Sequence, residues 1–238
     1  IIHFHFRSAL PRGVDVILWK LLGKKVIMHH HGSDIRYKGE RLFYSKFADK
    51  ILVSTPDLLE WSPDAIWIPN PIDLDKYPYV GVKNSSEEVK IVHAPSRRAI
   101  KGTEYIIEAV RTLKREGYRV NLILVENMPH KKAVEYYKQA DIVIDQLILG
   151  WYGMFAIECM ALGKPVCVYI QENLKANVRN LPVVNVSPNT LIEKLRILVE
   201  DYTLRKTIGK KSRKYVEQVH DARKVAKKVL SLYLGGDT

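Results

Sequence analysis

Strand and helix signals alternate along almost the whole chain, and this alternation limits the fold more than any other feature. Short apolar runs rich in β-branched residues are separated by amphipathic segments, which is typical of a parallel sheet with crossover helices on both faces. The run 89–93 predicts a strand, and Thr103 begins a helix whose apolar stripe ends before Gly117. The sequence therefore predicts an α/β protein.

The same signals predict the remaining elements. Strands are expected at 1–6, 25–29, 50–54, 65–68, 89–93, 120–125, 141–145, 166–170 and 181–186. Helices are expected at 13–22, in the segment before 50–54, from 103 onward, at 131–139, at 152–162, and in two or more pieces over 190–234.

A segment without helical periodicity divides the chain. It runs from the Pro-Asn-Pro-Ile-Asp sequence at 69–73 to about Ser86 and is rich in Pro, Tyr, Gly and Ser. We expect one domain over 1–78, a linker over 79–86 and a second domain from 87. Residue 1 is an isoleucine that already has strand character, so we also expect that the first domain lacks sequence upstream.

Composition excludes several classes of protein. The only cysteines, Cys159 and Cys167, lie in apolar surroundings, so neither a disulfide framework nor a zinc-binding spacing is indicated, and a cytoplasmic location is favoured. No apolar run approaches the ~20 residues that span a bilayer. A hydrolase is not indicated either, because no serine has a nucleophile-elbow context and no carboxylate pair suits a glycosidase.

Positive charge is concentrated near the C-terminus. The formal net charge is +12, and residues 203–234 carry ten basic and two acidic side chains. Such a surface can attract nucleic acid, anionic lipid headgroups or phosphorylated substrates, but a solvated helical face explains it equally well. The aromatic signature of RNA-binding modules is absent, so no nucleic-acid partner is expected.

A basic turn at 96–103 lies between a predicted strand and a predicted helix. It contains Arg98, Lys101 and Gly102. Ligands of doubly wound folds bind at the carboxyl ends of the strands, and a helix N-terminus offers backbone N–H groups to an anion. The basic side chains suit a pyrophosphate, although a basic turn that is merely solvated is the commoner case.

Three adjacent histidines, 29–31, follow a strand in the first half. They cannot all point into one metal site, so metal ligation is the weaker interpretation. His31 precedes Gly32, Ser33 and Asp34, and could bind a sugar or a phosphate at a strand end. A turn in which Asp34 caps the next segment explains this sequence equally well.

Glu158 lies in the predicted helix 152–162 among apolar residues. A glutamate is rarely buried without a partner, so it is either an exposed helix acid or a carboxylate directed at ligand hydroxyls. Tyr152 and Gly153 precede it in a glycine-containing turn.

These segments resemble the retaining nucleotide-sugar glycosyltransferases of the GT-B fold, family 4 in particular. Members carry an Arg followed by Lys-Gly after the first strand of the C-terminal domain, which Arg98, Lys101 and Gly102 match. They carry a Pro-Asn-Gly-Val-Asp type segment, which residues 69–73 resemble. Their two-glutamate signature, with Phe-Gly inside it and Ala-Met-Ala, Gly and Pro-Val after it, resembles residues 150–166.

The sequence departs from this family pattern at Gly150, where members carry the first glutamate. In the family that residue contacts the donor sugar, and the second glutamate, here Glu158, holds the nucleotide ribose. Either the turn 150–153 holds the sugar through backbone N–H groups and aromatic faces, or the protein binds a nucleotide without transferring a sugar. Asp145 or Gln146 could replace the missing acid.

The resemblance implies a GT-B architecture of two doubly wound parallel-sheet domains. Residues 1–78 would be the later part of the N-terminal, acceptor-side domain, which is incomplete here, and 87–218 would bind the nucleotide sugar. The final helix, within 219–238, would return to the N-terminal domain.

The resemblance also implies a function. The protein would transfer a sugar, with retention of configuration, from a nucleotide-sugar donor such as a UDP-sugar to a glycan or lipid-linked acceptor, without a metal or other cofactor. Donor-binding residues would be Arg98, Lys101, Gly102, Tyr152, Gly153 and Glu158, and His31 would contact the donor sugar as the catalytic residue. The basic C-terminal helices would allow peripheral contact with an anionic membrane at its inner face. A catalytically silent GT-B protein and, less favoured, a basic nucleic-acid-binding α/β protein are the alternatives.

Overall fold

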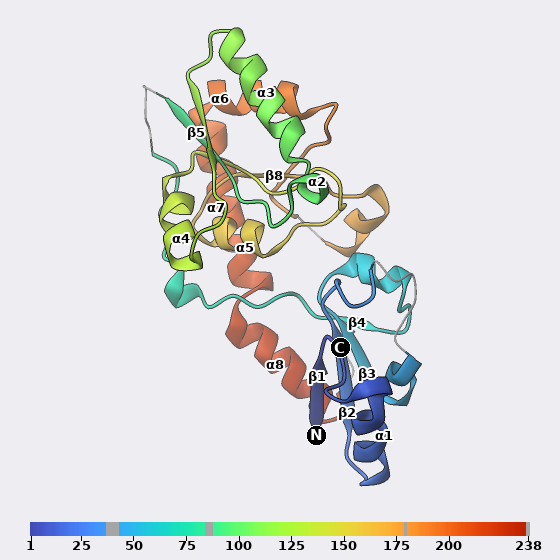
Figure 1. Ribbon diagram of the computed structural model, residues 1–238. Helices are drawn as coiled ribbons and strands as arrows, with labels where there is room; N and C mark the ends of the chain where they lie inside the picture. Colours follow the sequence, from blue (N-terminus) through green and yellow to red (C-terminus); the bar gives the residue numbers. More distant parts are fainter. Residues whose placement is uncertain (37–42, 84–87, 179, 237–238) are drawn as a thin grey trace. The chain divides into compact units, whose positions relative to one another are not determined.

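The computed structural model describes residues 1–36, 43–83, 88–178 and 180–236. The chain divides into two compact units (Figure 1). Unit 1 consists of Ile1–Pro71 and Arg223–Thr238, and unit 2 consists of Ile72–Ala222. Each unit is built around a parallel sheet, as the alternating sequence signals predicted.

The boundary after Pro71 lies earlier in the chain than the expected end of the first domain at residue 78. Residues after 71 belong to unit 2 because they are hydrogen-bonded there. The backbone N–H groups of Val80 and Gly81 donate to the carbonyl of Leu162 at 3.0 and 2.9 Å. Part of the expected linker is therefore packed against unit 2, while residues 84–87 lie outside the described chain.

Unit 1 contains a four-stranded parallel sheet in sequential order, β1-β2-β3-β4. Its strands are β1 Ile2–His5, β2 Val26–His30, β3 Lys50–Val53 and β4 Ile66–Trp67. Its helices are η1 Pro11–Gly13, α1 Val14–Leu21, η2 Phe43–Phe47, η3 Pro56–Glu60 and α8 Ala222–Tyr233. A helix was expected before β3; the described part of that segment contains only the short 3-10 helix η2, and the remainder includes residues 37–42, which are not described.

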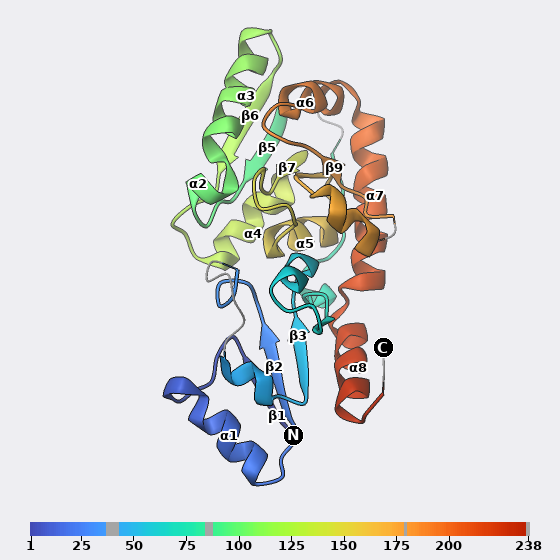
Figure 2. The ribbon, with the colours of Figure 1, turned by 90° about the vertical axis from the view of Figure 1, so that its right-hand side faces the viewer.

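Both faces of this sheet are covered. Ile27 and Leu52 point to one face and pack with Val225 and Leu232 of α8. Met28 points to the opposite face and packs in the cluster that includes α1. Because side chains alternate along a strand, a run buried at every position, as β2 is, requires cover on both sides. Figure 2 shows α8 running alongside the strands of this unit.

Unit 2 contains a five-stranded parallel sheet in the order β6-β5-β7-β8-β9. Its strands are β5 Val89–His93, β6 Val120–Leu124, β7 Ile142–Ile144, β8 Val166–Val168 and β9 Val184–Asn185. Its helices are η4 Leu74–Lys76, α2 Arg98–Lys101, α3 Thr103–Arg115, α4 His130–Gln139, α5 Met154–Ala161, η5 Glu172–Asn177, α6 Leu191–Glu200 and α7 Tyr202–Val219.

Helices also enclose the sheet of unit 2. Ile91 and Ile142 pack with residues of α3 and α6 on one face. Val92 and Val143 point the other way and are equally inaccessible, at 0% exposure. The strand expected over 181–186 is shorter than predicted, because only Val184 and Asn185 pair with β8. Pro182, within the expected range, has no N–H to donate to a ladder.

The two points at which the chain enters and leaves unit 2 lie side by side. Ile72 and Asp221 form an isolated parallel bridge. The N–H of Ile72 donates to the carbonyl of His220 at 2.8 Å, and the N–H of Ala222 donates to the carbonyl of Ile72 at 3.0 Å. Unit 2 is thus closed by backbone hydrogen bonds between its own ends.

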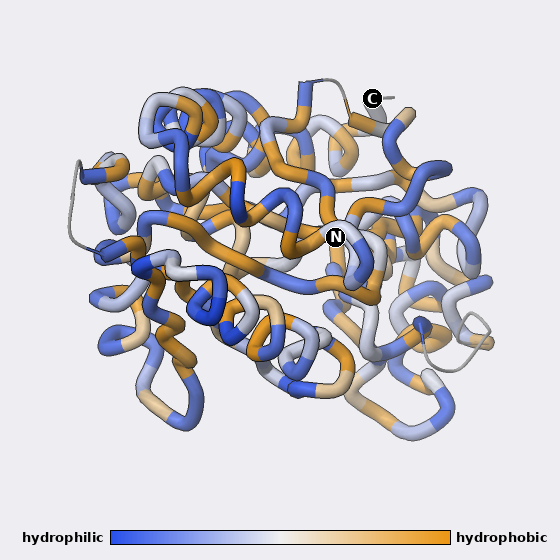
Figure 3. The backbone as a smooth tube through the Cα atoms, turned by 90° about the horizontal axis from the view of Figure 1, so that it is seen from above, coloured by the Kyte–Doolittle hydropathy of each residue, from blue (hydrophilic) through white to orange (hydrophobic). Residues whose placement is uncertain are grey.

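The hydropathy of the chain agrees with this burial. Figure 3 shows hydrophobic and hydrophilic segments alternating at short intervals along the backbone. Within the described ranges, no helix has both the length and the apolar character needed to cross a bilayer.

Candidate functional site

Lys101 and Gly153, two of the predicted donor-binding residues, meet at the carboxyl edge of the unit 2 sheet, and Asp145 joins them. Lys101 Nζ donates to Asp145 Oδ1 at 2.7 Å, and the Gly153 N–H donates to Asp145 Oδ2 at 2.7 Å. The Asp145 side chain is 0% exposed and that of Lys101 is 12% exposed. One carboxylate therefore holds the lysine beside the N-terminus of α5.

Two glycines make this close approach possible. Gly102 has φ +74°, a backbone conformation that lets α2 end and α3 begin without a break, and a Cβ there would lie 3.1 Å from the Leu147 Cβ. At Gly153 a Cβ would lie 3.4 Å from Lys101 Nζ and 3.5 Å from Asp145 Oδ2. Because Gly153 has no side chain, only backbone stands between the first turn of α5 and this lysine–carboxylate pair.

A buried histidine fixes the basic turn on the sheet. His93 Nδ1 is 2.7 Å from the carbonyl of Ile144, and His93 Nε2 is 2.9 Å from the hydroxyl of Thr103, the first residue of α3. Burial lowers the pKa of His93, so the ring is held in its neutral form. This residue connects β5, β7 and α3 behind Lys101.

Arg98 lies at the same edge of the sheet, but its side chain is more exposed to solvent than that of Lys101. Its guanidinium makes a bidentate contact with Glu126, Nε to Oε1 at 2.9 Å and Nη2 to Oε2 at 2.6 Å. The hydrogen bond from Arg98 lowers the pKa of Glu126. The side chain of Arg98 is 48% exposed, so it is accessible to a ligand that exchanges with Glu126.

Glu158 has partners within the protein. The residue is 8% exposed, and its Oε1 is 2.9 Å from His130 Nε2 at the start of α4. Burial, followed by the charge of Glu158 and a hydrogen bond to it, raises the pKa of the Tyr77 hydroxyl. The carboxylate in the apolar helix is thus buried and paired, with the His130 side chain, 61% exposed, on its open side.

Tyr152 was predicted to bind the donor, but its side chain is buried away from Lys101. The residue is 2% exposed, and its hydroxyl is 3.1 Å from the Tyr215 hydroxyl and 3.0 Å from His220 Nε2. The ring is part of the interior between the α5 turn and α7. Its side chain does not line the edge that carries Lys101.

Gly150 cannot be exchanged easily for the glutamate of the family pattern. Its φ is +81°, and a Cβ there would lie 3.0 Å from Gln171 Oε1. Gln146 is fully occupied: its amide donates to the carbonyls of Trp151 and Tyr169, and its Oε1 accepts from two backbone N–H groups of the loop. Of the two residues considered as replacements for the missing acid, Asp145 alone lies next to Lys101.

The carboxyl edge of the unit 1 sheet carries histidines. His31, the predicted catalytic residue, follows β2; its Nδ1 is 2.6 Å from the Ser54 hydroxyl and its Nε2 is 2.9 Å from His5 Nδ1. Burial, followed by the charge of His5, lowers the pKa of His31 to about 4. Burial also lowers the pKa of His3 to about 4 and that of His29 to about 2.

His30 points to the opposite face from its two neighbours. Its Nδ1 is 2.7 Å from Asp34 Oδ2, and Asp34 Oδ1 accepts from the N–H groups of His31 and Gly32 at 3.1 and 2.9 Å. Asp34 therefore does cap the turn after β2. The three adjacent histidines do not share one site, as expected.

Sequence reasoning did not assign Asp145 to Lys101, and did not find His130 or Tyr77 beside Glu158. Asp145 had a usable signal, because it is the last residue of a predicted strand and so lies at the same sheet edge as the basic turn. His130 and Tyr77 had none, since each reaches Glu158 only through tertiary packing.

Comparisons with known proteins agree with this architecture. Residues 115–215, which include β6 to β9 and α5, match the family model described as glycosyl transferases group 1. A search of curated proteins found no match.

Solved structures share the fold over nearly the whole chain. A sucrose-phosphate synthase from Thermosynechococcus elongatus matches with a TM-score of 0.67 and 18% identity, over 98% of this chain and 73% of that one. HepE from Anabaena, solved in complex with UDP-glucose, matches with a TM-score of 0.67 and 12% identity, over 94% and 76%. TarM from S. aureus, solved with UDP among its ligands, matches with a TM-score of 0.64 and 14% identity, over 93% and 58%. The GT-B fold predicted from the sequence is thereby confirmed.

Proposed function

We propose, since residues 115–215 match the family model described as glycosyl transferases group 1, that unit 2 binds a nucleotide sugar through its diphosphate. The observation that carries the proposal is the position of Lys101, whose Nζ is held by Asp145 at the N-terminus of α5. The first turn of a helix has N–H groups without intrahelical partners and a positive dipole end. A diphosphate there would accept hydrogen bonds from these groups and from the lysine.

Arg98 supplies a second positive charge at the same edge. On binding, a phosphate oxygen would replace one carboxylate oxygen of Glu126 in the bidentate contact. As the bond between sugar and phosphate breaks, negative charge grows on the departing nucleoside diphosphate. Lys101, Arg98 and the α5 N-terminus would stabilise that charge.

Glu158 would hold the ribose. Its partner His130 is 61% exposed at the side chain and can turn into solvent, which frees one carboxylate oxygen for the ribose hydroxyls. Tyr77 keeps the carboxylate oriented during this exchange. His130→Ala is therefore expected to leave nucleotide binding intact or to strengthen it, whereas Glu158→Gln weakens it.

Transfer to a glycan or lipid-linked acceptor, with retention and with His31 contacting the sugar, is the remaining part of the proposal. The match of residues 115–215 to the glycosyl transferases group 1 model supports the reaction type. The UDP and UDP-glucose found in the TarM and HepE structures favour uracil as the first base to test.

The first experiment is a thermal-shift and calorimetric titration of the chain with UDP, GDP and ADP. We expect one of them to bind at one site, and Lys101→Ala to weaken binding about 10- to 100-fold, as loss of a charge-assisted phosphate contact does. Lys138→Ala is the matched control, because Lys138 pairs with Glu135 on the exposed side of α4. If none of the three nucleotides binds, the proposal is wrong.

Gly153→Ala gives a sharper test of where the diphosphate lies. The backbone of Gly153 has φ −102° and ψ −175°, which alanine adopts, and the new Cβ would make only ordinary contacts at 3.4 Å or more. The variant should fold normally while its methyl group occupies the approach to the α5 N-terminus. Unchanged nucleotide affinity in this variant would place the diphosphate elsewhere.

A catalytically silent nucleotide-binding protein is the second candidate, favoured by Gly150. The positive φ and the contact with Gln171 leave no room for the acid that contacts the sugar in the family. In that case UDP would bind, but UDP-sugars would be neither transferred nor hydrolysed. Release of UDP from an intact UDP-sugar, reduced by His31→Ala, would support transfer instead.

Contact with an anionic membrane is a further part of the proposed function. Lys206, Lys210 and Lys214 are exposed and lie four residues apart on α7, so they form one stripe on the helix. A lipid-linked acceptor would bring this stripe to the surface on which the acceptor resides. Cosedimentation with anionic but not neutral vesicles, reduced in the triple Lys→Gln variant, is the expected result.

A further inference from the structure

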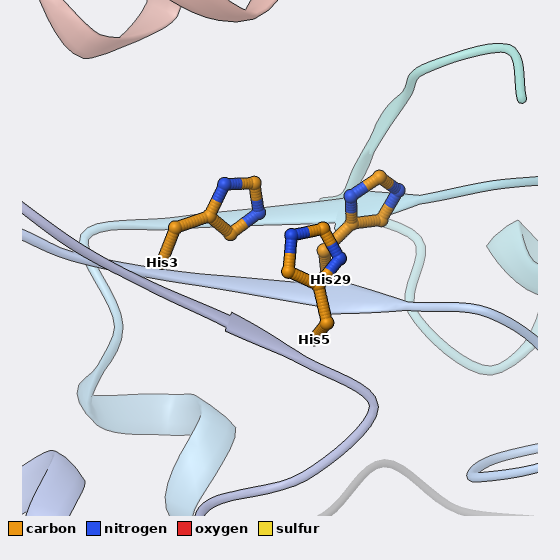
Figure 4. A group of neighbouring side chains, drawn as sticks. All are labelled: His3, His5 and His29. Carbon is orange, nitrogen blue, oxygen red and sulfur yellow. The ribbon is translucent and has the colours of Figure 1, made fainter. Parts of the chain in front are cut away.

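Four imidazoles gather on one face of the unit 1 sheet. His3 and His5 are two residues apart on β1, and His29 lies opposite His5 in the register between β1 and β2. Side chains two residues apart on a strand point to the same face, so His31 continues the row beyond β2. Figure 4 shows the rings of His3, His5 and His29 grouped above the two strands.

The nitrogens of three of these rings are close enough to converge on one ion. One nitrogen each from His3, His5 and His29 can be chosen so that all three lie within 4.8 Å of one another. A tetrahedral zinc ion with Zn–N bonds of about 2.0–2.1 Å needs nitrogens about 3.4 Å apart. The rings must rotate to close that difference, because His3 stacks on His5 with an interplanar angle of 25° and on His29 with one of 12°. The β1 and β2 backbones already hold the three residues in register.

Two nitrogens in this group have unmet bonding capacity. Among the residues that the structure describes, His3 Nε2 and His29 Nδ1 are buried and have no hydrogen-bond partner. His29 as a whole is 6% exposed. An unpartnered buried nitrogen costs free energy, which a bound cation would recover.

The opposite nitrogen of each ring is held by a neighbour. His3 Nδ1 contacts the Tyr233 hydroxyl, His29 Nε2 is 3.1 Å from the Ser54 hydroxyl, and His5 Nδ1 is 2.9 Å from His31 Nε2. One set of tautomers satisfies all of these contacts. In it, each of these three nitrogens is the N–H donor, and Ser54 accepts from both His29 and His31.

That arrangement leaves lone pairs on His3 Nε2, His5 Nε2 and His29 Nδ1. Imidazoles that ligate a metal ordinarily donate their other N–H to a fixed acceptor, which sets the tautomer and orients the ring. The cluster has this second set of contacts on all three residues. A chance stack of histidines does not require them.

We propose that His3, His5 and His29 bind one divalent transition-metal ion of the zinc class. Imidazole nitrogen is a preferred ligand of Zn²⁺, Co²⁺, Ni²⁺ and Cu²⁺, whereas Mg²⁺ and Ca²⁺ prefer oxygen. Three protein ligands leave a fourth position for water or a substrate group. His31 is a positioning residue, because it orients His5 through its Nε2. This site does not depend on the proposed nucleotide binding.

The test is metal binding by the full chain after treatment with EDTA and dialysis. Titration with Zn²⁺ in a calorimeter should give one ion per chain, and Co²⁺ should give the strong visible absorption of a four-coordinate site. Absence of saturable binding, or a Co²⁺ spectrum of a weak six-coordinate complex, would overturn the proposal.

Variants then locate the ion. His5→Gln changes an exposed ring and should lower Zn²⁺ affinity at least 10- to 100-fold, while His130→Gln in unit 2 should leave it unchanged. His29→Gln should abolish stoichiometric binding if circular dichroism shows that it folds; if it does not fold, His5→Gln decides. Zn²⁺ binding of the same affinity in His5→Gln would assign the ion to adventitious surface ligands and refute the site.

Discussion

The two parallel sheets carry opposite chemistry at the same edge. At the carboxyl edge of the unit 2 sheet, cations and carboxylates are paired, Lys101 with Asp145 and Arg98 with Glu126. At the carboxyl edge of the unit 1 sheet, imidazoles contact one another and a serine hydroxyl, and burial keeps His29 neutral. The topology determines where a ligand binds, and the side chains determine the charge of the ligand. Cationic N–H donors suit an anion, and the lone pairs of neutral imidazoles suit a cation.

The largest effect is expected when the buried charge pair is broken. Asp145→Ala leaves Lys101, 12% exposed at the side chain, without its carboxylate and the Gly153 N–H without an acceptor. We expect the free energy of unfolding to fall by about 3–5 kcal/mol, as for other buried pairs that lose one partner. Urea denaturation measures this change.

A double variant separates charge from packing at this position. In Lys101→Met with Asp145→Asn, the amide oxygen still accepts from Gly153 and no charge is stranded. Its stability should lie well above that of Asp145→Ala. If the two variants are equally destabilised, the unpaired charge is not the cause.

Acid should destabilise the fold through the buried His29 of the unit 1 sheet. The unfolded chain binds a proton at His29 near pH 6.5, whereas the folded pKa of His29 is about 2. Between these values the unfolded state holds more protons, so stability falls as pH falls below 6.5, by about 1.4 kcal/mol per pH unit for this one residue. Lowering the pH from 6.5 to about 5 should therefore cost about 2 kcal/mol from His29 alone.

Comparison with His29→Asn isolates that contribution from other titrating groups, including His3 and His31 nearby. Denaturation curves at pH 7 and pH 5 are needed for both proteins, without added metal. The variant should lose less stability on acidification than the parent chain. Equal losses would mean that His29 is protonated in the folded state.

A smaller effect is expected from salt, which should weaken ligand binding at the unit 2 site more than at the unit 1 site. A diphosphate held by Lys101 and Arg98 is attracted by charge, so its affinity should fall several-fold between about 50 and 500 mM salt. Zn²⁺ bound by neutral imidazoles should change by less than about twofold. Calorimetry at both ionic strengths checks this, and equal salt dependence at the two sites would contradict the contrast in charge.

The smallest effect is expected at an exposed ion pair in unit 1. Lys20 Nζ lies 2.6 Å from Asp49 Oδ1, about the same distance as in the Lys101 pair, but its side chains are 36% and 31% exposed. Lys20→Met should change the free energy of unfolding by only about 0–1 kcal/mol. Asp49 must be kept, because it also accepts from the Val26 N–H. A loss as large as that of Asp145→Ala would show that distance, and not burial, governs these pairs.

Much of the fold could be predicted because it depends on local signals. The strand Val89–His93 and the helix that begins at Thr103 have the predicted limits, and Gly102 ends one helical turn and starts the next through its positive φ. The strand Val184–Asn185 is shorter than the predicted 181–186, because an apolar run shows that a segment is buried but not how many of its residues pair with the next strand. The segment before β3 appeared helical, but the part that is described forms only a short 3-10 turn.

The residues of the candidate sites were likewise predictable only where a local sequence signal exists. Lys101 and Gly153 could be brought together in advance, because both follow strands that end at one sheet edge. The buried Tyr152 ring and the contact between His130 and Glu158 depend on packing across helices, for which the sequence has no local signal. The alternation of His3 and His5 is visible in the sequence, but their proximity to His29 requires knowing that β1 pairs with β2 in this register.

The bridge between Ile72 and Asp221 has a consequence for how the molecule can be taken apart. Because unit 2 begins and ends at one hydrogen-bonded point, residues 72–222 have adjacent termini and their own sheet and core. Such a segment can be expressed alone, or its ends can be joined and new ones opened in an exposed loop, without cutting any strand of its sheet. In genetic terms, one uninterrupted stretch of codons encodes unit 2, and it lies between the two stretches that encode unit 1.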